Sequence, residues 1–283
     1  SIAIVGAKPN ARYLTFSCEY FNVGGLVLNY VETECTVALA DRYSNKIGFP
    51  TNVVFRTEAG SITAEALTIE SGNDMGMATI TARTQNPRPE NVPPLAGEPF
   101  TGDANPRDGL VTIIAATTGE EEFTDVNGNG GFDAGEPFVD MGEAFIDIND
   151  NGLRDPEEQF IDANSNSFYD PPNGVWDSDT LIWTTAYMLW TGEAVFMPQD
   201  DCGAANRYSG ICPTTFSIAY ENQMEFTWQA KDGNMNPINE TLRVSVNVEG
   251  DGDLEGSSPP LSWDAPDTLG GWADPNTYWT RCG

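Results

Sequence analysis

The stretch Ala78-Thr79-Ile80-Thr81-Ala82 alternates apolar and threonine side chains, which places the two kinds on opposite faces of an extended chain. Two other stretches, Thr36-Val37-Ala38-Leu39-Ala40 and Asn52-Val53-Val54-Phe55-Arg56, are short, rich in β-branched residues and followed by turn-forming residues. Such runs are typical of the strands of a β-sandwich, and no window has a convincing helical period. We therefore expect residues 1–119 to form a sandwich whose last strand includes Leu110 to Ala115.

The composition divides the chain into three zones. Residues 1–119 carry alternating runs of this kind, and residues 181–283 carry them again, beginning with the apolar stretch from Leu181 to Trp190. Between these zones, residues 120–180 hold 17 acidic side chains and a single basic one, Arg154. The sequence therefore predicts an all-β chain of two β-sandwiches joined by an acidic segment. The alternative for this segment is a disordered linker.

The charge and the missing histidine exclude several classes of protein. The chain has 283 residues, with 43 acidic and 13 basic side chains and no histidine, which gives a net charge of −30. A nucleic-acid binder needs a basic face, and anionic lipid repels such a charge. No stretch approaches the roughly 20 apolar residues that span a membrane. Without histidine there is no Ser-His-Asp or Cys-His nucleophile. From these three observations we expect no nucleic-acid partner, no membrane insertion and no catalytic residue.

The five cysteines indicate an exported protein. None belongs to a Cys-x-x-Cys pair, so a cysteine-rich zinc site is not expected. Cys18 with Cys35 and Cys202 with Cys212 form two local pairs, and Cys282 is left over. We expect disulfide bonds and an extracellular or cell-surface location, with free thiols in a reducing cytosol as the alternative.

The acidic segment contains a calcium loop of twelve residues, from Asp125 to Glu136. Oxygen-bearing side chains stand at positions 1, 3, 5, 9 and 12, and a glycine stands at position 6, where the chain turns sharply. Calcium takes about six to eight oxygen ligands, including the carbonyl of position 7 and both oxygens of the final glutamate. The predicted ligands are Asp125, Asn127, Asn129, the Gly131 carbonyl, Asp133 and Glu136, with Asp140 expected to add a ligand to this first site.

The pattern recurs twice. The second loop has the predicted ligands Asp147, Asn149, Asn151, the Leu153 carbonyl, Asp155 and Glu158. The third has the predicted ligands Asp162, Asn164, Asn166, the Phe168 carbonyl and Asp170. Ser167 replaces its turn glycine and Asn173 its final glutamate, so we expect a weaker site or one that uses Asp177 or Asp179. The prediction is two to three Ca²⁺ ions, bound with dissociation constants of roughly 10⁻⁴ to 10⁻³ M.

Four Phe-x-Asp triplets accompany these loops, with the phenylalanines at positions 123, 138, 145 and 160. We expect the phenylalanines to form a small apolar spine, with scattered contacts to a neighbouring sandwich as the alternative. Without metal, the acidic side chains repel one another. Our hypothesis is that calcium converts a flexible connector into a rigid spacer between two sandwiches.

Two parts of the chain share a turn followed by a strand. The first is Asp41 to Ile47 with the strand Val53 to Ile62, and the second is Lys231 to Ile238 with the strand that follows. Both resemble bacterial immunoglobulin-like domains of the invasin and intimin type. The family pattern is an Asp-x-x-x-Asn-Pro turn before a Val-x-Phe strand that ends in glycine, and Lys46 replaces the usual proline. The resemblance implies immunoglobulin-like surface modules, and the loops resemble EF-hand-like, calcium-stapled acidic repeats of bacterial surface proteins.

These features predict a calcium-stabilised structural or adhesive protein of a bacterial surface or fibre. Its expected partners are other copies of itself or neighbouring surface domains, with a glycan or a host or abiotic surface as a further partner. One alternative is a filament subunit joined through Cys282 or by strand addition of Ser1 to Val5. Another is a glycan-binding or glycan-degrading module in which Trp263, Trp272 and Trp279 stack on sugars.

Overall fold

A computed structural model describes residues 6, 8–100, 102–198, 228–239, 241, 243–246, 261–265 and 267–269. The predictions for Ser1–Val5, Cys202, Cys212, Cys282, Trp272 and Trp279 lie outside these residues, and Trp263 is described in its backbone alone. The chain divides into two compact units. Unit 1 comprises Ser1–Glu19, Glu32–Pro87 and Thr112–Ala186, and unit 2 comprises Tyr20–Val31, Arg88–Val111 and Tyr187–Gly283.

The described residues form strands and two short 3₁₀ helices, which confirms the all-β prediction. The strands are β1 (Leu14–Cys18), β2 (Asn22–Val23), β3 (Glu32–Leu39), β4 (Asn52–Thr57), β5 (Ser61–Ile62), β6 (Glu65–Leu67), β7 (Met77–Arg83), β8 (Leu110–Gly119), β9 (Thr180–Trp190), β10 (Val195–Pro198), β11 (Trp228–Lys231), β12 (Arg243–Val246) and β13 (Leu261–Asp264). The 3₁₀ helices are η1 (Ala11–Tyr13) and η2 (Pro106–Gly109). Among the described residues, no helix has the length and apolar character needed to cross a membrane.

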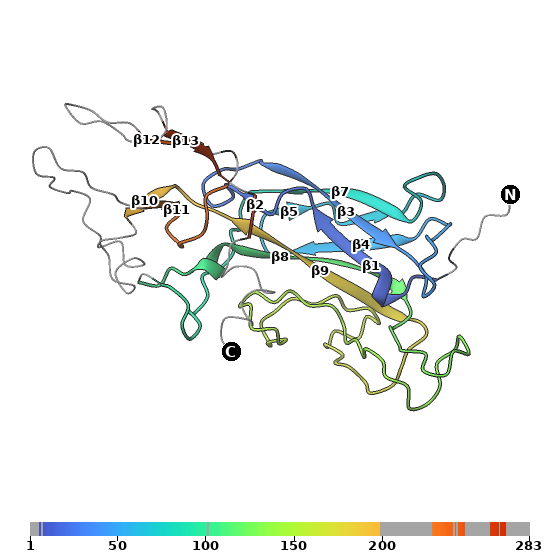
Figure 1. Ribbon diagram of the computed structural model, residues 1–283. Helices are drawn as coiled ribbons and strands as arrows, with labels where there is room; N and C mark the ends of the chain where they lie inside the picture. The colour runs from blue at the N-terminus through green and yellow to red at the C-terminus, as the bar shows by residue number, and fades with distance from the viewer. Residues whose placement is uncertain are drawn as a thin grey trace, which may run out of the picture. The chain divides into compact units, whose positions relative to one another are not determined.

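The strands form two larger sheets, as a β-sandwich requires (Figure 1). One has the order β1-β3-β7-β5, and the other has the order β2-β9-β8-β4-β6. The remaining strands form the two-stranded sheets β10-β11 and β12-β13. Strand β2 pairs with β9 in parallel. The pairs β1–β3, β3–β7, β5–β7, β4–β6, β4–β8, β10–β11 and β12–β13 are antiparallel.

Side-chain alternation builds the core of unit 1, as the sequence predicts. In β7, Ala78, Ile80 and Ala82 are buried and their neighbours are more exposed. The rings of Phe16 in β1 and Phe55 in β4 lie 5.5 Å apart, so side chains from the two sheets share one core.

The predicted disulfide bond between Cys18 and Cys35 is present. The two residues lie opposite each other in the antiparallel pair of β1 and β3. Cys35 is completely buried, so the bond joins these strands inside the sandwich.

Strand β8 is buried on both of its faces. Ala115 lies opposite Phe55 in the register of β8 with β4, which places it on the face of the shared core. Ile114 and Ala116 point to the other face because side chains alternate along a strand, and both are completely buried. A second layer must therefore cover the outward face of β8.

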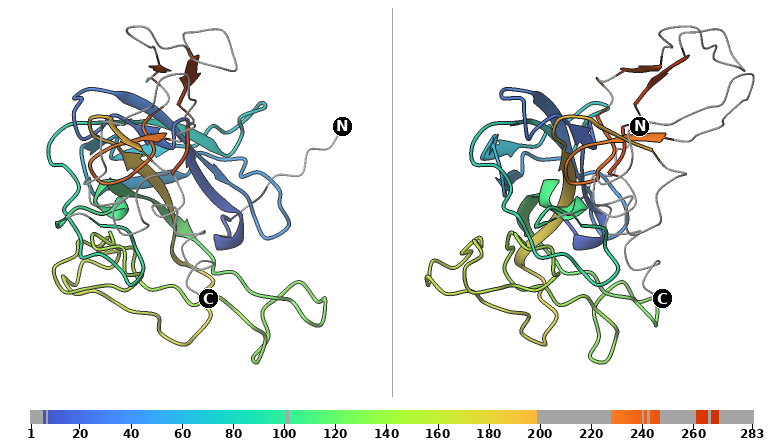
Figure 2. Two further views of the ribbon diagram at one scale, coloured as in Figure 1. Left: turned by 60° about the vertical axis from the view of Figure 1, so that its left-hand side comes forward. Right: turned by 90° about the vertical axis from the view of Figure 1, so that its left-hand side faces the viewer.

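The acidic segment supplies this layer. Ala144 and Ile146 form a buried cluster with Ile114 and Ala116, against which Trp183 of β9 also packs. Figures 1 and 2 show the segment as long loops on one side of β8 and β9. Because β8 and β9 are neighbours in one sheet, the segment connects adjacent strands of the same sheet. This differs from the expected spacer between two sandwiches, and the units of the structure do not coincide with the expected boundaries at 119/120 and 180/181.

Turns of the same geometry begin at Asp41 in unit 1 and at Asp232 in unit 2. The side chains of Asp41 and Asp232 each accept hydrogen bonds from the backbone N–H groups two and four residues later. The third residue after each aspartate has a positive φ, 64° at Ser44 and 67° at Met235. The two segments thus share this local turn.

Candidate metal-binding loops

All of the predicted metal ligands lie in described parts of unit 1. We name the three predicted loops A (Asp125–Glu136), B (Asp147–Glu158) and C (Asp162–Asp170). The segment contains no helix in the structure, so the loops lack the two flanking helices of an EF-hand.

The first aspartate of each loop organises the backbone turn. In loop A, Asp125 accepts a hydrogen bond at Oδ1 from Asn129 N (3.2 Å) and one at Oδ2 from Gly130 N (2.7 Å). Asp147 in loop B and Asp162 in loop C accept the same two bonds. The first aspartate therefore draws positions 5 and 6 of each loop around itself.

The sixth position explains why loop C differs from the others. Gly130 and Gly152 have φ values of 80° and 77°, in the left-handed region that glycine adopts without steric cost. Ser167 adopts the same conformation, with a φ of 66°. A side chain in this region costs roughly 1–2 kcal/mol, so Ser167 makes this turn less favourable than a glycine would.

The polar side chains of positions 3, 5 and 9 converge on one point. Asn127 and Asn129 each direct Nδ2 at Asp133 Oδ2, at 2.7 and 2.5 Å. The same pairs of bonds meet at Asp155 in loop B and at Asp170 in loop C. Three polar side chains thus converge on one point in each loop, and carboxylate and amide oxygens are the types of ligand that suit a hard cation.

Position 7 is expected to contribute its backbone carbonyl. The N–H groups of Gly131, Leu153 and Phe168 donate to the asparagine Oδ1 two residues earlier, at 2.8, 2.6 and 2.6 Å. The side chains of Leu153 and Phe168 are exposed. This exposure is compatible with a ligand role that uses only the main chain.

The final glutamate closes loops A and B through both of its oxygens. Glu136 accepts bonds from Val126 N (2.8 Å) and Asp133 N (3.0 Å). Glu158 accepts the corresponding bonds in loop B, at 3.0 and 2.8 Å. Both carboxylates are buried, so each holds the second and ninth positions of its loop together.

Loop C is closed by a residue that the sequence analysis did not identify. Glu143 accepts bonds from Ala163 N (2.7 Å) and Asp170 N (3.1 Å), the second and ninth positions of this loop. The two acceptor oxygens thus hold the same positions as Glu136 does in loop A. Asp177, which was expected to substitute for the missing glutamate, belongs to a different arrangement.

That arrangement, which we name the split loop, repeats the same contacts with residues from three parts of the chain. Asp140 accepts bonds from Asn173 N (3.0 Å) and Gly174 N (2.5 Å), and Asn173 Nδ2 donates to Asp177 Oδ2 (2.7 Å). Glu121 accepts bonds from Asp177 N (2.8 Å) and from the N–H that follows Asp140 (2.7 Å). The split loop lacks the position-3 contact of the other loops, and it contains Asp140, which was expected to join the first site.

A repeated Glu-x-Phe-x-Asp pattern accounts for all four arrangements. It occurs in the segments Glu121–Asp125, Glu136–Asp140, Glu143–Asp147 and Glu158–Asp162. The backbone of Phe123 forms an isolated antiparallel β-bridge with that of Phe138, and the backbone of Phe145 forms one with that of Phe160. We name the first two segments, with loop A and the split loop, the outer pair, and the last two, with loops B and C, the inner pair. The full five-residue pattern is the signal that could have identified Glu121 and Glu143.

Aromatic side chains pack between the loops of each pair, in two clusters and not in one spine. In the outer pair, Phe132 of loop A stacks on Trp176 of the split loop with ring centroids 4.9 Å apart. In the inner pair, the Arg154 guanidinium of loop B lies 5.2 Å from the Tyr169 ring of loop C. The four residues occupy the eighth position of their loops, so this position joins the two members of each pair.

Buried carboxylates give the loops an unfavourable charge. Burial raises the pKa of Glu121 and of Glu158, and the nearby aspartates raise it further, although backbone N–H groups oppose the effect. In contrast, Asn149 and Asn151 lower the pKa of Asp155 by donating hydrogen bonds to it. A bound cation would favour the ionised form of the buried glutamates.

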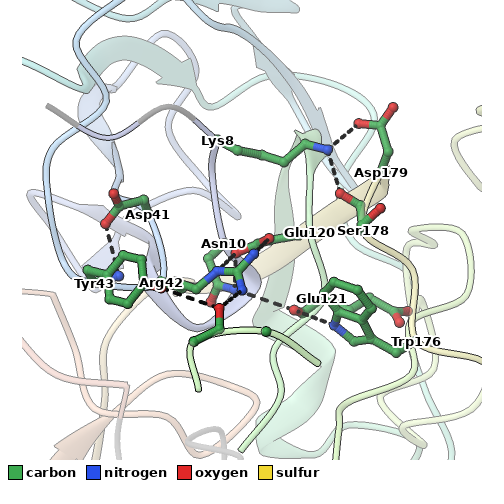
Figure 3. A network of polar contacts seen from close by, with 12 residues as sticks. Lys8, Asn10, Asp41, Arg42, Tyr43, Glu120, Glu121, Trp176, Ser178 and Asp179 are labelled. Atoms are coloured by element: carbon green, nitrogen blue, oxygen red, sulfur yellow. Dashed lines mark hydrogen bonds and ion pairs between the residues drawn. The ribbon is translucent and has the colours of Figure 1, made fainter. Parts of the chain in front are cut away.

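Two basic residues attach the ends of the acidic segment to the sandwich (Figure 3). Arg42 donates to both oxygens of Glu120, at 2.9 and 2.5 Å, and to the Gly130 carbonyl of loop A at 2.9 Å. Lys8 Nζ lies 2.9 Å from Asp179 Oδ1, at the other end of the segment. Asp179 therefore has a cationic partner in place of the loop role expected for it.

The donor sets depend on amide and backbone oxygens as well as on carboxylates. In the described part of the chain, no group of three or more histidine, cysteine, aspartate and glutamate side chains is arranged to hold a metal ion. Calcium is bound by carbonyl and amide oxygens as well as by carboxylates, so the residues present fit this ion better than a transition metal.

Comparisons with known protein families, curated protein sequences and solved structures give no match. The resemblance to invasin-type and intimin-type domains therefore stays a prediction.

Proposed function

We propose that loops A, B and C bind Ca²⁺ and so stabilise an extracellular β-sandwich protein with a structural or adhesive role. The observation that carries this proposal is the repeated donor set, in which asparagine and aspartate side chains converge on one point and a buried glutamate closes each loop. Calcium tolerates such sets of about six to eight oxygens, whereas Mg²⁺ demands a near-octahedral shell and retains water.

The charge of the segment supports a structural role for the metal. Residues 120–180 have a net charge of −16, and three Ca²⁺ ions would reduce it to about −10. Binding to a segment with little core of its own contributes directly to its folding free energy.

The location of the segment adds a consequence for the sandwich. Its apolar side chains pack on the outward face of β8, so metal that orders the loops also stabilises this layer. A disulfide bond and weak calcium sites both suit an extracellular setting, where calcium is abundant.

Thermal unfolding and metal analysis test the proposal together. Protein stripped with a chelator is dialysed against about 5 mM CaCl₂ or MgCl₂, bound metal is counted by elemental analysis, and unfolding is followed by calorimetry. We expect at least two bound Ca²⁺ ions and a higher melting temperature in calcium than in magnesium. Protein that retains no calcium and melts at the same temperature in calcium, in magnesium and in chelator would refute the proposal.

A further inference from the structure

We infer that the acidic segment folds in a fixed order, in which the inner pair must form before the split loop of the outer pair can close. The inner pair is inserted into the split loop, between Asp140 and Asn173. These two residues are 33 positions apart, yet they are joined by a hydrogen bond of 3.0 Å. Closing a flexible chain of this length carries an entropic cost, which an already folded insert removes.

Contacts at the base of the inner pair bring the two ends of the insert together. Glu143 N donates to the Asp170 carbonyl at 2.9 Å, beside the side-chain bond that Glu143 makes to Asp170 N. A Cβ atom on Gly142 would lie 2.8 Å from Pro172 Cδ and 2.9 Å from the Asp170 carbonyl. The chain therefore enters and leaves the inner pair side by side, which positions Asp140 close to Asn173.

The inner pair has no corresponding need for the outer pair. Its residues are continuous from Glu143 to Asp170, and Ala144 and Ile146 pack directly on β8. Its own closure joins residues 20 and 27 positions apart. The dependence is therefore hierarchical: the split loop can open with the inner pair intact, whereas loss of the inner pair opens both.

This order follows from protein contacts and does not require metal. It does not rest on the proposed binding of Ca²⁺ by loops A, B and C.

Hydrogen exchange of two pairs of amides tests the order. Met141 N and Asp177 N donate to Glu121 and report on the outer pair, while Ala163 N and Asp170 N donate to Glu143 and report on the inner pair. Exchange is measured in calcium and in chelator for wild type, Glu121→Gln and Glu143→Gln. Glu157→Gln is the control, because this exposed residue undergoes the same change of charge.

In Glu143→Gln, we expect all four amides to exchange faster by a similar factor, on the order of tenfold. In Glu121→Gln, we expect that increase at Met141 and Asp177 and a smaller one at Ala163 and Asp170. The conservative variant Glu143→Asp should show the same pattern if Glu143→Gln does not fold.

Protected outer amides in either Glu143 variant would overturn the inference, and so would equal increases at all four amides in Glu121→Gln. Wild-type protein without protection at these amides in both solutions would overturn it as well. A failure of calcium binding alone would instead leave the order of opening measurable in the metal-free protein.

Discussion

Replacing Glu158 by glutamine is expected to remove most of the calcium-dependent stability that loop B supplies. Both carboxylate oxygens accept backbone hydrogen bonds, from Ile148 N at 3.0 Å and Asp155 N at 2.8 Å, and the side chain is 3% exposed. Glutamine has almost the same shape but only one acceptor oxygen, and its NH₂ group would face a backbone N–H. It also cannot chelate Ca²⁺ with two oxygens.

The magnitude follows from the linkage between binding and folding. A site with a dissociation constant of about 10⁻⁴ M adds about 2.3 kcal/mol to the free energy of unfolding at about 5 mM Ca²⁺. A site roughly a hundredfold weaker adds about 0.2 kcal/mol at that concentration, so Glu158→Gln should lose about 2 kcal/mol. This corresponds to a decrease of about 4–8 °C in the calcium-dependent part of the melting temperature.

Calorimetry with and without calcium separates this loss from a general destabilisation. In chelator, the lost hydrogen bond costs about 1–3 kcal/mol, and removal of a buried charge near Asp147 and Asp155 offsets part of that cost. The control is Glu157→Gln, whose exposed side chain undergoes the same change of charge. If calcium raises the melting temperature of both variants equally, Glu158 is not a ligand and the assignment of position 12 fails.

Three further outcomes are expected. Replacing both Cys18 and Cys35 by serine removes their bond and should lower the free energy of unfolding by about 3 kcal/mol, because the bond closes a loop of 17 residues. A urea titration measures this loss, and an unchanged midpoint would contradict it. Arg42→Lys should lower the free energy of unfolding by about 1–3 kcal/mol even in chelator, because lysine cannot donate to both oxygens of buried Glu120 in the way that the guanidinium does. An unchanged free energy of unfolding would show that this paired contact is unimportant. Burial raises the pKa of Asp232 above 3.8, so the folded state binds a proton at this carboxylate at a higher pH than the unfolded state does. The folded state therefore gains stability as the pH falls through its own pKa. The Asp232→Asn variant has no such proton to bind. Its loss of unfolding free energy relative to wild type, measured by urea titration, should therefore be larger at about pH 3 than at about pH 7, and a larger loss at about pH 7 would refute this expectation.

The sequence predicted those features that depend on neighbouring residues. Strand β7 follows from its alternating side chains, and the turns of loops A and B follow from a spacing that contains every predicted ligand within twelve residues. In each case the local pattern is sufficient, because the hydrogen bonds that define it join residues only a few positions apart.

The closing residues of the other two arrangements could not be obtained in this way. The twelve-residue pattern requires the glutamate of loop C to lie eleven residues after Asp162, but this position is Asn173. The structure uses Glu143, which precedes the loop, and it uses Glu121 for the split loop. Their positions depend on which strands pair, and that pairing becomes visible in the sequence only when the full Glu-x-Phe-x-Asp pattern is considered.

The place of the acidic segment was the main difference between expectation and structure, and β8 contains the reason. Its stretch from Leu110 to Ala116 is apolar at nearly every position, as expected for a strand covered on both faces. The outward residues Ile114 and Ala116 need a covering layer, and Ala144 and Ile146 provide it. Folding of the acidic segment and burial of this face are therefore one process. A ligand that binds only the folded loops must stabilise the sheet beneath them, and calcium removal should expose an apolar surface on which the protein can aggregate.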